Sequence, residues 1–218
     1  MVKKQGIKAV IFDVGGVLAL GKKHLMYKKG KYHNSGVYEY VVKKLNISPD
    51  QYLDSIDTSY AKSIVGEISR SKVLSILAKN FKTIPKKIEK IYLKAYKKNF
   101  NQNKELYKTA FRLKKAGYKI AILSDQGYIS QEALMLKKYT QKFDVMIVSC
   151  EVGVRKLNPK IYKLVLKKLK IPAKNCIFID NQDWNINSAK KLGIKTILFK
   201  NNKQTLNKLS KFLKCQKI

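Results

Sequence analysis

The hydrophobic and polar positions of this chain follow two rhythms, and one short apolar run near the start stands out. Residues 9–12 read AVIF, an uninterrupted apolar run that predicts a strand buried on both faces of a parallel sheet. The run ends at Asp13 and is followed by Gly15 and Gly16, which allow the backbone to turn and to approach a ligand closely. We therefore expect Asp13 at the carboxyl end of a strand, where ligands bind in open α/β sheets.

The segment that follows is predicted to be a loop and then a group of helices. Residues 17–33 are polar with glycine breakers, which indicates a loop leaving the sheet. Apolar positions then recur at helical spacing, and nothing in residues 34–100 predicts a strand. Four helices are expected. The first covers residues 36–45, and the second begins at a capping box formed by Ser48 and Gln51. The third begins after Ser69, its predicted cap, and the fourth runs from Pro85 towards Phe100.

From Asn103 onward, helical and strand patterns alternate. Helices are predicted up to Gly117, over residues 130–138 and 158–170, up to Gly193, and at the C-terminal end. The strands between them are predicted to end at Ser124, Cys150, Asp180 and Phe199. This order predicts an α/β fold: a three-layer, Rossmann-like parallel sheet core over residues 1–16 and 101–218, with an all-helical cap inserted at 17–100.

Composition narrows the class of protein. The 218 residues carry a net charge of +33, which attracts polyanions, but 44 of the 47 basic residues are lysines spread over nearly every segment. Specific nucleic-acid readers rely on arginine, which occurs three times here, so we expect only weak, non-specific polyanion binding. No apolar run is long enough to span a membrane, and no signal peptide is visible. Three cysteines without a CxxC pair and two histidines favour a reducing, cytoplasmic setting and make a zinc site improbable.

Four polar side chains follow the predicted strands at the same edge of the sheet. They are Asp13, Ser124, Lys156 and Asp180. A carboxylate, a hydroxyl and an ammonium gathered there suit phosphoryl transfer, in which a carboxylate attacks phosphorus and cations compensate the phosphate charge. Ser124 and backbone N–H groups near Gly15 and Gly16 would hold phosphate oxygens. Taken singly, Asp13 can also cap a turn, and Ser124 and Asp180 can also cap helices.

The segments around these residues resemble the motifs of one family. FDVGGVL, ILSD, GVRKLNPKIY and FIDNQDWNINSAKKLGI, in this order, are similar to the four motifs of haloacid dehalogenase-superfamily hydrolases with a helical cap inserted after the first strand. The segment GEIS also resembles a recurring cap sequence. Within the superfamily, the chain most resembles sugar-phosphate phosphatases with glycine two residues after the nucleophile. The resemblance covers essentially the whole chain.

The resemblance implies a Mg²⁺-dependent phosphatase acting on a small phosphorylated substrate through an aspartyl-phosphate. The implied catalytic residues are Asp13, the nucleophile, and Lys156. The implied substrate-binding residues are Gly15, Gly16, Ser124, Asp125 and Lys156. The implied metal site comprises Asp13, Gly15, Asp180 and Asn181.

The chain departs from the family pattern at two positions. Most phosphatases of the superfamily carry a second Asp, a general acid and base, where this chain has Gly15, and a second acid where it has Asn181. Because general acid–base assistance contributes about 10²–10⁴ in rate, we expect slow turnover. Asp183 could partly replace the missing acid or be an ordinary first-turn helix acid. His24, Tyr27, Tyr32 and His33 lie where a cap would meet substrate.

Two other functions remain as alternatives. A 2-haloacid dehalogenase uses the same Asp nucleophile on carbon without metal, and the absence of acids at Gly15 and Asn181 favours it. That group carries a DxYGT first motif, however, which Gly16 and Val17 do not fit well. The second alternative is a non-catalytic relative that binds polyanions, favoured by the same two positions and by the net charge.

Overall fold

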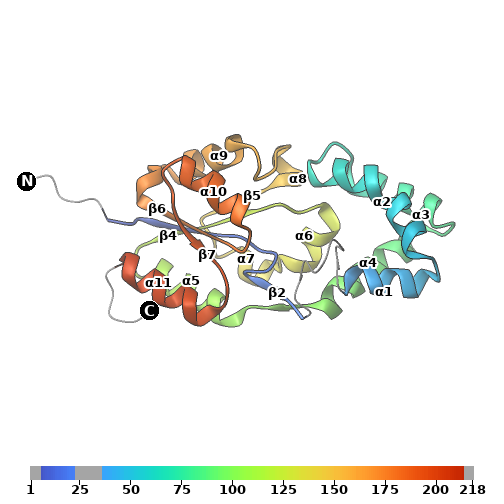
Figure 1. Cartoon of the computed structure of the whole chain (residues 1–218), viewed down its shortest axis with the longest axis horizontal. Coiled ribbons are helices and arrows are strands. Elements are labelled where there is room, and N and C mark those ends of the chain that lie inside the picture. Colours follow the sequence, from blue (N-terminus) through green and yellow to red (C-terminus); the bar gives the residue numbers. More distant parts are fainter. Residues whose placement is uncertain (1–5, 23–35, 214–218) are drawn as a thin grey trace, which may run out of the picture.

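A computed structural model describes residues 6–22 and 36–213 of the chain. Its centre is a five-stranded parallel sheet in the order β5-β4-β1-β6-β7, with β1 in the middle (Figure 1). The strands are β1 (Ala9–Phe12), β4 (Lys119–Ser124), β5 (Val145–Val148), β6 (Cys176–Asp180) and β7 (Lys195–Leu198). All four residues of β1 are fully buried, as the continuous apolar run predicts for a strand covered on both faces. The predicted α/β class and parallel sheet are confirmed.

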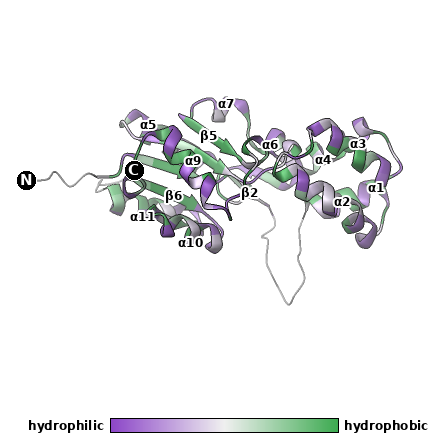
Figure 2. Cartoon of the chain, turned by 90° about the horizontal axis from the view of Figure 1, so that it is seen from above, coloured by the Kyte–Doolittle hydropathy of each residue, from purple (hydrophilic) through white to green (hydrophobic). Residues whose placement is uncertain are grey.

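Helices cover both faces of this sheet and form the outer layers. Val10 and Phe12 of β1 point into one apolar cluster with α5 (Lys104–Lys115) and α11 (Asn202–Leu213). Ala9 and Ile11 point into a second cluster with α9 (Pro159–Leu169) and α10 (Asp183–Lys191). Figure 1 shows the sheet between these two pairs of helices, and in Figure 2 the strands are mainly hydrophobic whereas the helices mix hydrophilic and hydrophobic residues. The period-two alternation of β1 therefore supplies both halves of the core.

Four helices form a separate apolar cluster beyond the carboxyl ends of the strands. They are α1 (Val37–Leu45), α2 (Pro49–Ile64), α3 (Arg70–Asn80) and α4 (Pro85–Asn99). Buried residues from all four, such as Val41, Tyr52, Leu77 and Ile88, pack together. The predicted capping box is present: Gln51 N donates to Ser48 Oγ at 3.1 Å, and Ser48 N donates to Gln51 Oε1 at 2.9 Å. Ser69 caps α3 as expected.

The prediction of a loop followed only by helices over residues 17–100 missed a short strand near each end of this segment. Two three-residue strands, β2 (Ala19–Gly21) and β3 (Phe100–Gln102), pair antiparallel where the chain enters and leaves the helical group. Asn103 fastens this ribbon to the core, because its Nδ2 donates to Val17 O at 2.9 Å while its Oδ1 caps α5. Strands this short carry too little periodicity to be recognised from sequence.

Two boundaries in the core also differ from prediction. The helix expected over residues 130–138 is two helices, α6 (Tyr128–Leu134) and α7 (Lys137–Thr140), because the chain turns at Met135 and Leu136 and buries Leu134 and Met135 in one cluster. The strand expected to end at Cys150 ends at Val148. Ser149 instead starts the short helix α8 (Ser149–Val152), and its hydroxyl bonds the backbone of Gln126 in place of a ladder partner. A 3₁₀ turn, Ala173–Asn175, precedes β6.

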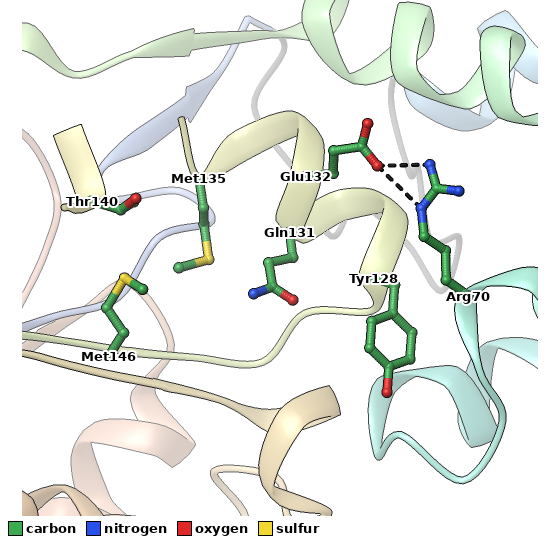
Figure 3. A pocket seen from close by; sticks show the side chains of 7 residues that line it. All are labelled: Arg70, Tyr128, Gln131, Glu132, Met135, Thr140 and Met146. Carbon is green, nitrogen blue, oxygen red and sulfur yellow. Dashed lines mark hydrogen bonds and ion pairs between the residues drawn. The ribbon is translucent and has the colours of Figure 1, made fainter. Parts of the chain in front are cut away.

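The helical group contacts the core closely at α6 and α8. Arg70 at the start of α3 donates from Nε and Nη2 to Glu132 of α6 at 3.1 and 2.7 Å (Figure 3). Arg70 also pairs with Glu89 of α4. Gly66, before α3, has φ +68°, and a Cβ there would lie 2.1 Å from the carbonyl oxygen of Cys150. Only glycine permits this approach. Among the described residues, no helix is both long and apolar enough to cross a membrane.

Substituting Gly66 tests this contact. We expect Gly66→Ala to destabilise the protein by about 1–3 kcal/mol through overpacking, in addition to about 1–2 kcal/mol for the left-handed backbone. Gly193→Ala is the matched control, since Gly193 has φ +80° but nothing within 4 Å of an added Cβ. Free energies of unfolding from urea denaturation give the comparison. Equal losses for the two variants would show that the close approach at Cys150 has no energetic weight.

Candidate active site

Asp13 lies at the carboxyl end of the central strand, as the sequence predicts. Its backbone N–H donates to Ile179 O of β6 at 2.9 Å, so the strand pairing continues to this residue. The register pairs Phe12 with Ile179 of β6 and with Ile122 of β4. Asp13 is therefore adjacent to Asp180 on one side and close to Ser124 on the other, although only 5% of its surface is exposed.

Lys156 brings a buried ammonium between two carboxylates. Its Nζ lies 2.8 Å from Asp13 Oδ1 and 2.6 Å from Asp180 Oδ2, with 4% of the side chain exposed. The loop that carries Lys156 is held by Asp125: Lys156 N donates to Asp125 Oδ1 at 3.0 Å, and Arg155 Nε lies 3.3 Å from Asp125 Oδ2. Asp125 thus lies behind the site and positions the loop.

A second hydrogen-bonded chain reaches Asp13 from β4. Ser124 Oγ donates to Asp13 Oδ1 at 2.9 Å, and Gln126 Nε2 donates to Ser124 Oγ at 3.2 Å. Both side chains are buried. Since a hydroxyl has one proton, this chain directs the proton of Ser124 at the carboxylate. Oδ1 of Asp13 therefore accepts from both Ser124 and Lys156.

Asp180 is surrounded by N–H donors. Its Oδ1 accepts from Gln182 N at 2.8 Å and Asn185 Nδ2 at 3.2 Å, and its Oδ2 accepts from Lys156 Nζ and from Asn185 Nδ2 at 3.1 Å. Asp180 is fully buried. This carboxylate both caps the turn into α10 and holds Lys156. Asp183 is exposed in the first turn of α10.

The two glycines after Asp13 face different neighbours. Gly16 has φ +80°, and a Cβ there would lie 2.5 Å from Asn181 Nδ2, so only glycine leaves room for this amide. The Oδ1 atom of Asn181 is buried without a hydrogen-bond partner in the described part of the chain. Gly15 is roomier: the nearest atom to an added Cβ is Gln126 Nε2, at 3.6 Å.

Burial and neighbouring charges tune the central pair. Burial raises the pKa of Asp13 to about 6 from its ordinary 3.8; the Lys156 ammonium opposes this rise and the Asp180 carboxylate adds to it. Burial alone would lower the pKa of Lys156, but Asp13 and Asp180 outweigh it and hold that pKa above its ordinary value. Near neutral pH the site therefore contains a carboxylate at Asp13 and a firmly protonated Lys156.

The structure thus brings together Asp13, Ser124, Lys156 and Asp180, and sequence reasoning missed two of their partners. Gln126 and Asn185 each bond directly to one of the four. Both stand near the end of a strand that carries a predicted site residue, which is the one signal that could have marked them. His24, Tyr27, Tyr32 and His33 lie outside the described residues.

A cavity of about 330 Å³ lies elsewhere, beside α6, and none of the predicted site residues lines it (Figure 3). Its lining residues are Arg70, Tyr128, Gln131, Glu132, Met135, Thr140 and Met146. The candidate active site is therefore the polar cluster at the strand ends.

These features define an α/β protein with a polar, charged site at the carboxyl ends of a parallel sheet, and comparison with known proteins gives the family. The family model for haloacid dehalogenase-like hydrolases matches residues 7–193, so the chain belongs to this family and is a hydrolase. The predicted superfamily and its helical cap after the first strand are confirmed. A hydrolase assignment does not favour the non-catalytic alternative.

Several relatives are informative. The chain is 26% identical to bifunctional epoxide hydrolase 2 of Sus scrofa over 226 aligned positions, covering 94% of this chain but 38% of that protein. It is 35% identical over 95 residues to glyceraldehyde 3-phosphate phosphatase of Pyrococcus furiosus, covering 43% of this chain and 40% of that one. The chain thus spans about two fifths of the length of these relatives.

A solved structure shares the fold. A haloacid dehalogenase family enzyme of Bacteroides thetaiotaomicron, in complex with magnesium and inorganic phosphate, superposes with a TM-score of 0.71. The two chains are 21% identical, and the match covers 89% of this chain and 95% of that one. At this identity the likeness shows the arrangement of core and cap.

Replacing Lys156 tests the buried ion pairs. We expect Lys156→Met to destabilise the protein by about 3–5 kcal/mol at pH 8, because two buried carboxylates lose their cation. Lys114→Met is the control, since Lys114 pairs with Asp144 at 3.1 Å with 42% of its side chain exposed, and such pairs contribute about 1 kcal/mol or less.

The loss should also depend on pH. The folded-state pKa of Asp13 already lies above its ordinary 3.8, so ionising Asp13 weakens the fold as the pH rises through about 6. Removing the ammonium raises that pKa further, and proton uptake then restores stability at pH 5. Urea denaturation should show that Lys156→Met loses less unfolding free energy at pH 5 than at pH 8. A loss that is the same at both pH values would show that Lys156 does not stabilise the ionised form of Asp13.

Proposed function

We propose that this hydrolase is a Mg²⁺-dependent phosphatase that acts on a small phosphorylated metabolite through an aspartyl-phosphate, an acyl phosphate formed on Asp13. One observation carries the proposal: the Lys156 ammonium lies 2.8 Å from the Asp13 carboxylate, next to the Ser124 hydroxyl, at the carboxyl edge of the sheet. The phosphatase activity named for the Pyrococcus relative, and the magnesium and phosphate named for the Bacteroides structure, support it.

The geometry suggests how the two oxygens of Asp13 divide their roles. Oδ1 accepts hydrogen bonds from Ser124 and Lys156, whereas no described residue donates to Oδ2. We assign Oδ2 as the atom that attacks phosphorus while the bond from phosphorus to the leaving oxygen breaks. Water then attacks phosphorus, the bond to Oδ2 breaks, the carboxylate is regenerated, and inorganic phosphate and a proton are released to solvent. Lys156 and Ser124 balance the charge gathered near Oδ1.

The residues around Asn181 fit a magnesium ion. Mg²⁺ prefers oxygen donors and needs one or two protein carboxylates together with water and substrate phosphate. We assign Asp13, the Gly15 carbonyl and Asn181 Oδ1 as its oxygen donors, because the buried Asn181 oxygen has no other partner within the described residues. The family resemblance also implies Asp180 as a ligand, but we assign it to holding Lys156, since each of its oxygens already accepts two hydrogen bonds, whereas Asp13 keeps Oδ2 free of donors from the described residues. A bound Mg²⁺ would neutralise phosphate charge.

Gly15 limits the rate in this account. No side chain at that position can protonate the leaving group or take a proton from water, so both transfers fall to solvent. We further propose that residues 17–100 act as the cap that covers the site.

Two substitutions at the nucleophile loop test the mechanism. Asp13→Asn should abolish hydrolysis of an aryl phosphate, because an amide cannot form the intermediate. Gly15→Asp should raise kcat by about 10²–10⁴, the typical contribution of a general acid and base. A Cβ at this position meets nothing closer than 3.6 Å and the backbone is not left-handed, so a residue with a side chain is accommodated there without backbone strain. Activity that survives in Asp13→Asn, or a Gly15→Asp enzyme no faster than the parent, would count against the mechanism.

Asn181 offers a test of the metal site. Asn181→Asp keeps the shape of the side chain and adds one negative charge, so we expect the Mg²⁺ concentration for half-maximal activity to fall about tenfold, the effect of about 1.4 kcal/mol of added attraction. Asp183→Asn is the control at the exposed acid nearby and should leave the Mg²⁺ requirement unchanged. An unchanged requirement in Asn181→Asp would remove Asn181 from the metal site.

Metal-free displacement of halide from carbon is the second candidate function. It is favoured by the absence of a carboxylate at Gly15 and at Asn181, which leaves the site with the carboxylates of Asp13 and Asp180. The titration with Mg²⁺ separates the two, because chelation should abolish phosphatase activity. Chloride release from a 2-chloroacid that persists in chelator would instead favour the dehalogenase.

A further inference from the structure

The space beside Gly15 is bounded by the side chain of Gln126. Gln126 Nε2 is the nearest atom to a Cβ built on Gly15, at 3.6 Å, and only 7% of Gln126 is exposed. The backbone of Gln126 is fixed by Ser149, whose hydroxyl accepts from Gln126 N at 3.0 Å and donates to Gln126 O at 3.3 Å. The backbone of Gln126 is therefore held by the loop itself, and a substitution of the side chain leaves those backbone bonds in place.

The hydrogen bonds of Gln126 leave it one donor to spare. A carboxamide has two N–H donors, and one of them is used by Ser124 Oγ at 3.2 Å. Within the described residues, no other side-chain partner of Gln126 occurs. The amide cannot release a proton at neutral pH, so it can donate a hydrogen bond but cannot act as an acid.

We propose that Gln126 is the residue that stabilises the leaving group, by donating its second N–H to the leaving-group oxygen in the space beside Gly15. When the bond from phosphorus breaks, its electron pair stays on that oxygen, which departs as an anion and later takes a proton from water. The hydrogen bond stabilises this anion without protonating it. The substrate class is then phosphate esters and anhydrides whose leaving group is a stable anion, such as acyl, enol or aryl phosphates, in preference to simple alkyl phosphates. This inference rests on the proposed phosphatase function.

The test is a leaving-group series on a double-mutant cycle. The logarithm of kcat/KM is measured against the leaving-group pKa for nitrophenyl, phenyl and alkyl phosphates. The proteins are the parent, Gln126→Met, Gly15→Asp and the double variant. Gln126→Met keeps the volume of the side chain and removes both polar atoms. Gln131→Met is the matched control, because Gln131 bonds Glu151 and Cys150, outside the site.

The parent should show a steep fall of kcat/KM with leaving-group pKa. Gln126→Met should lose roughly tenfold on the alkyl phosphate and less on nitrophenyl phosphate, which steepens the slope. In the Gly15→Asp background the same substitution should cost little, because the new carboxyl protonates the leaving oxygen. The two positions should therefore be coupled.

A cooperative unfolding transition would first show that Gln126→Met is folded. The inference is overturned if this folded variant lowers kcat/KM by the same factor for every substrate, in both the parent and the Gly15→Asp protein, or does not lower it at all. Gln126→Ala serves as a second substitution if the methionine disturbs folding. A parent that hydrolyses none of the phosphates, or an Asp13→Asn variant as active as the parent, would instead reject the phosphatase function itself.

Discussion

The site depends on one buried ammonium held between two carboxylates. Removing a charge from water costs several kcal/mol per ion, so Lys156 is stable here only because Asp13 and Asp180 lie at 2.8 and 2.6 Å. The sheet supplies that geometry, since the register of β1 and β6 puts the two carboxylates side by side at the ends of adjacent strands. Asp125 fixes the loop that carries Lys156, and Asn185 fixes the carboxylate of Asp180. Packing of the sheet and charge balance in the site are thus two aspects of one arrangement.

The same arrangement explains why few charged atoms of the site are free to contact a substrate. Asp180 uses all its hydrogen-bonding capacity on N–H donors, and Asn181 and Gly15 contribute no carboxylate. A substrate phosphate would therefore meet one free carboxylate oxygen, one ammonium and the neutral donor Gln126. In the proposed mechanism, such a site can form a covalent intermediate, but it leaves proton transfer to solvent and so selects for leaving groups that need no proton.

Much of the fold could be predicted, because its strands are apolar runs with clear ends and its helices carry caps such as Ser48 and Asn158, whose side chain accepts from Lys160 N at 3.0 Å. Short features could not: β2 and β3 have three residues each, and their pairing depends on where the helical group leaves the core. The turn at Met135 follows from tertiary burial that local pattern does not encode.

The candidate site divides in the same way. Asp13, Ser124 and Asp180 follow from strand ends, whereas Lys156, one of 44 lysines, was singled out only by the resemblance of its motif. The roles of Gln126 and Asn185 depend on side-chain hydrogen bonds across the fold, which no sequence spacing reveals.

Whether Asp13 is the nucleophile is tested by quenching the enzyme with acid during turnover of an aryl phosphate and mapping modified peptides by mass spectrometry. One residue, Asp13, should be phosphorylated, and its phosphate should disappear when turnover is allowed to finish. Phosphate on another residue, or release of phosphate with no labelled enzyme under single-turnover conditions, would contradict the assignment of Asp13 as the nucleophile.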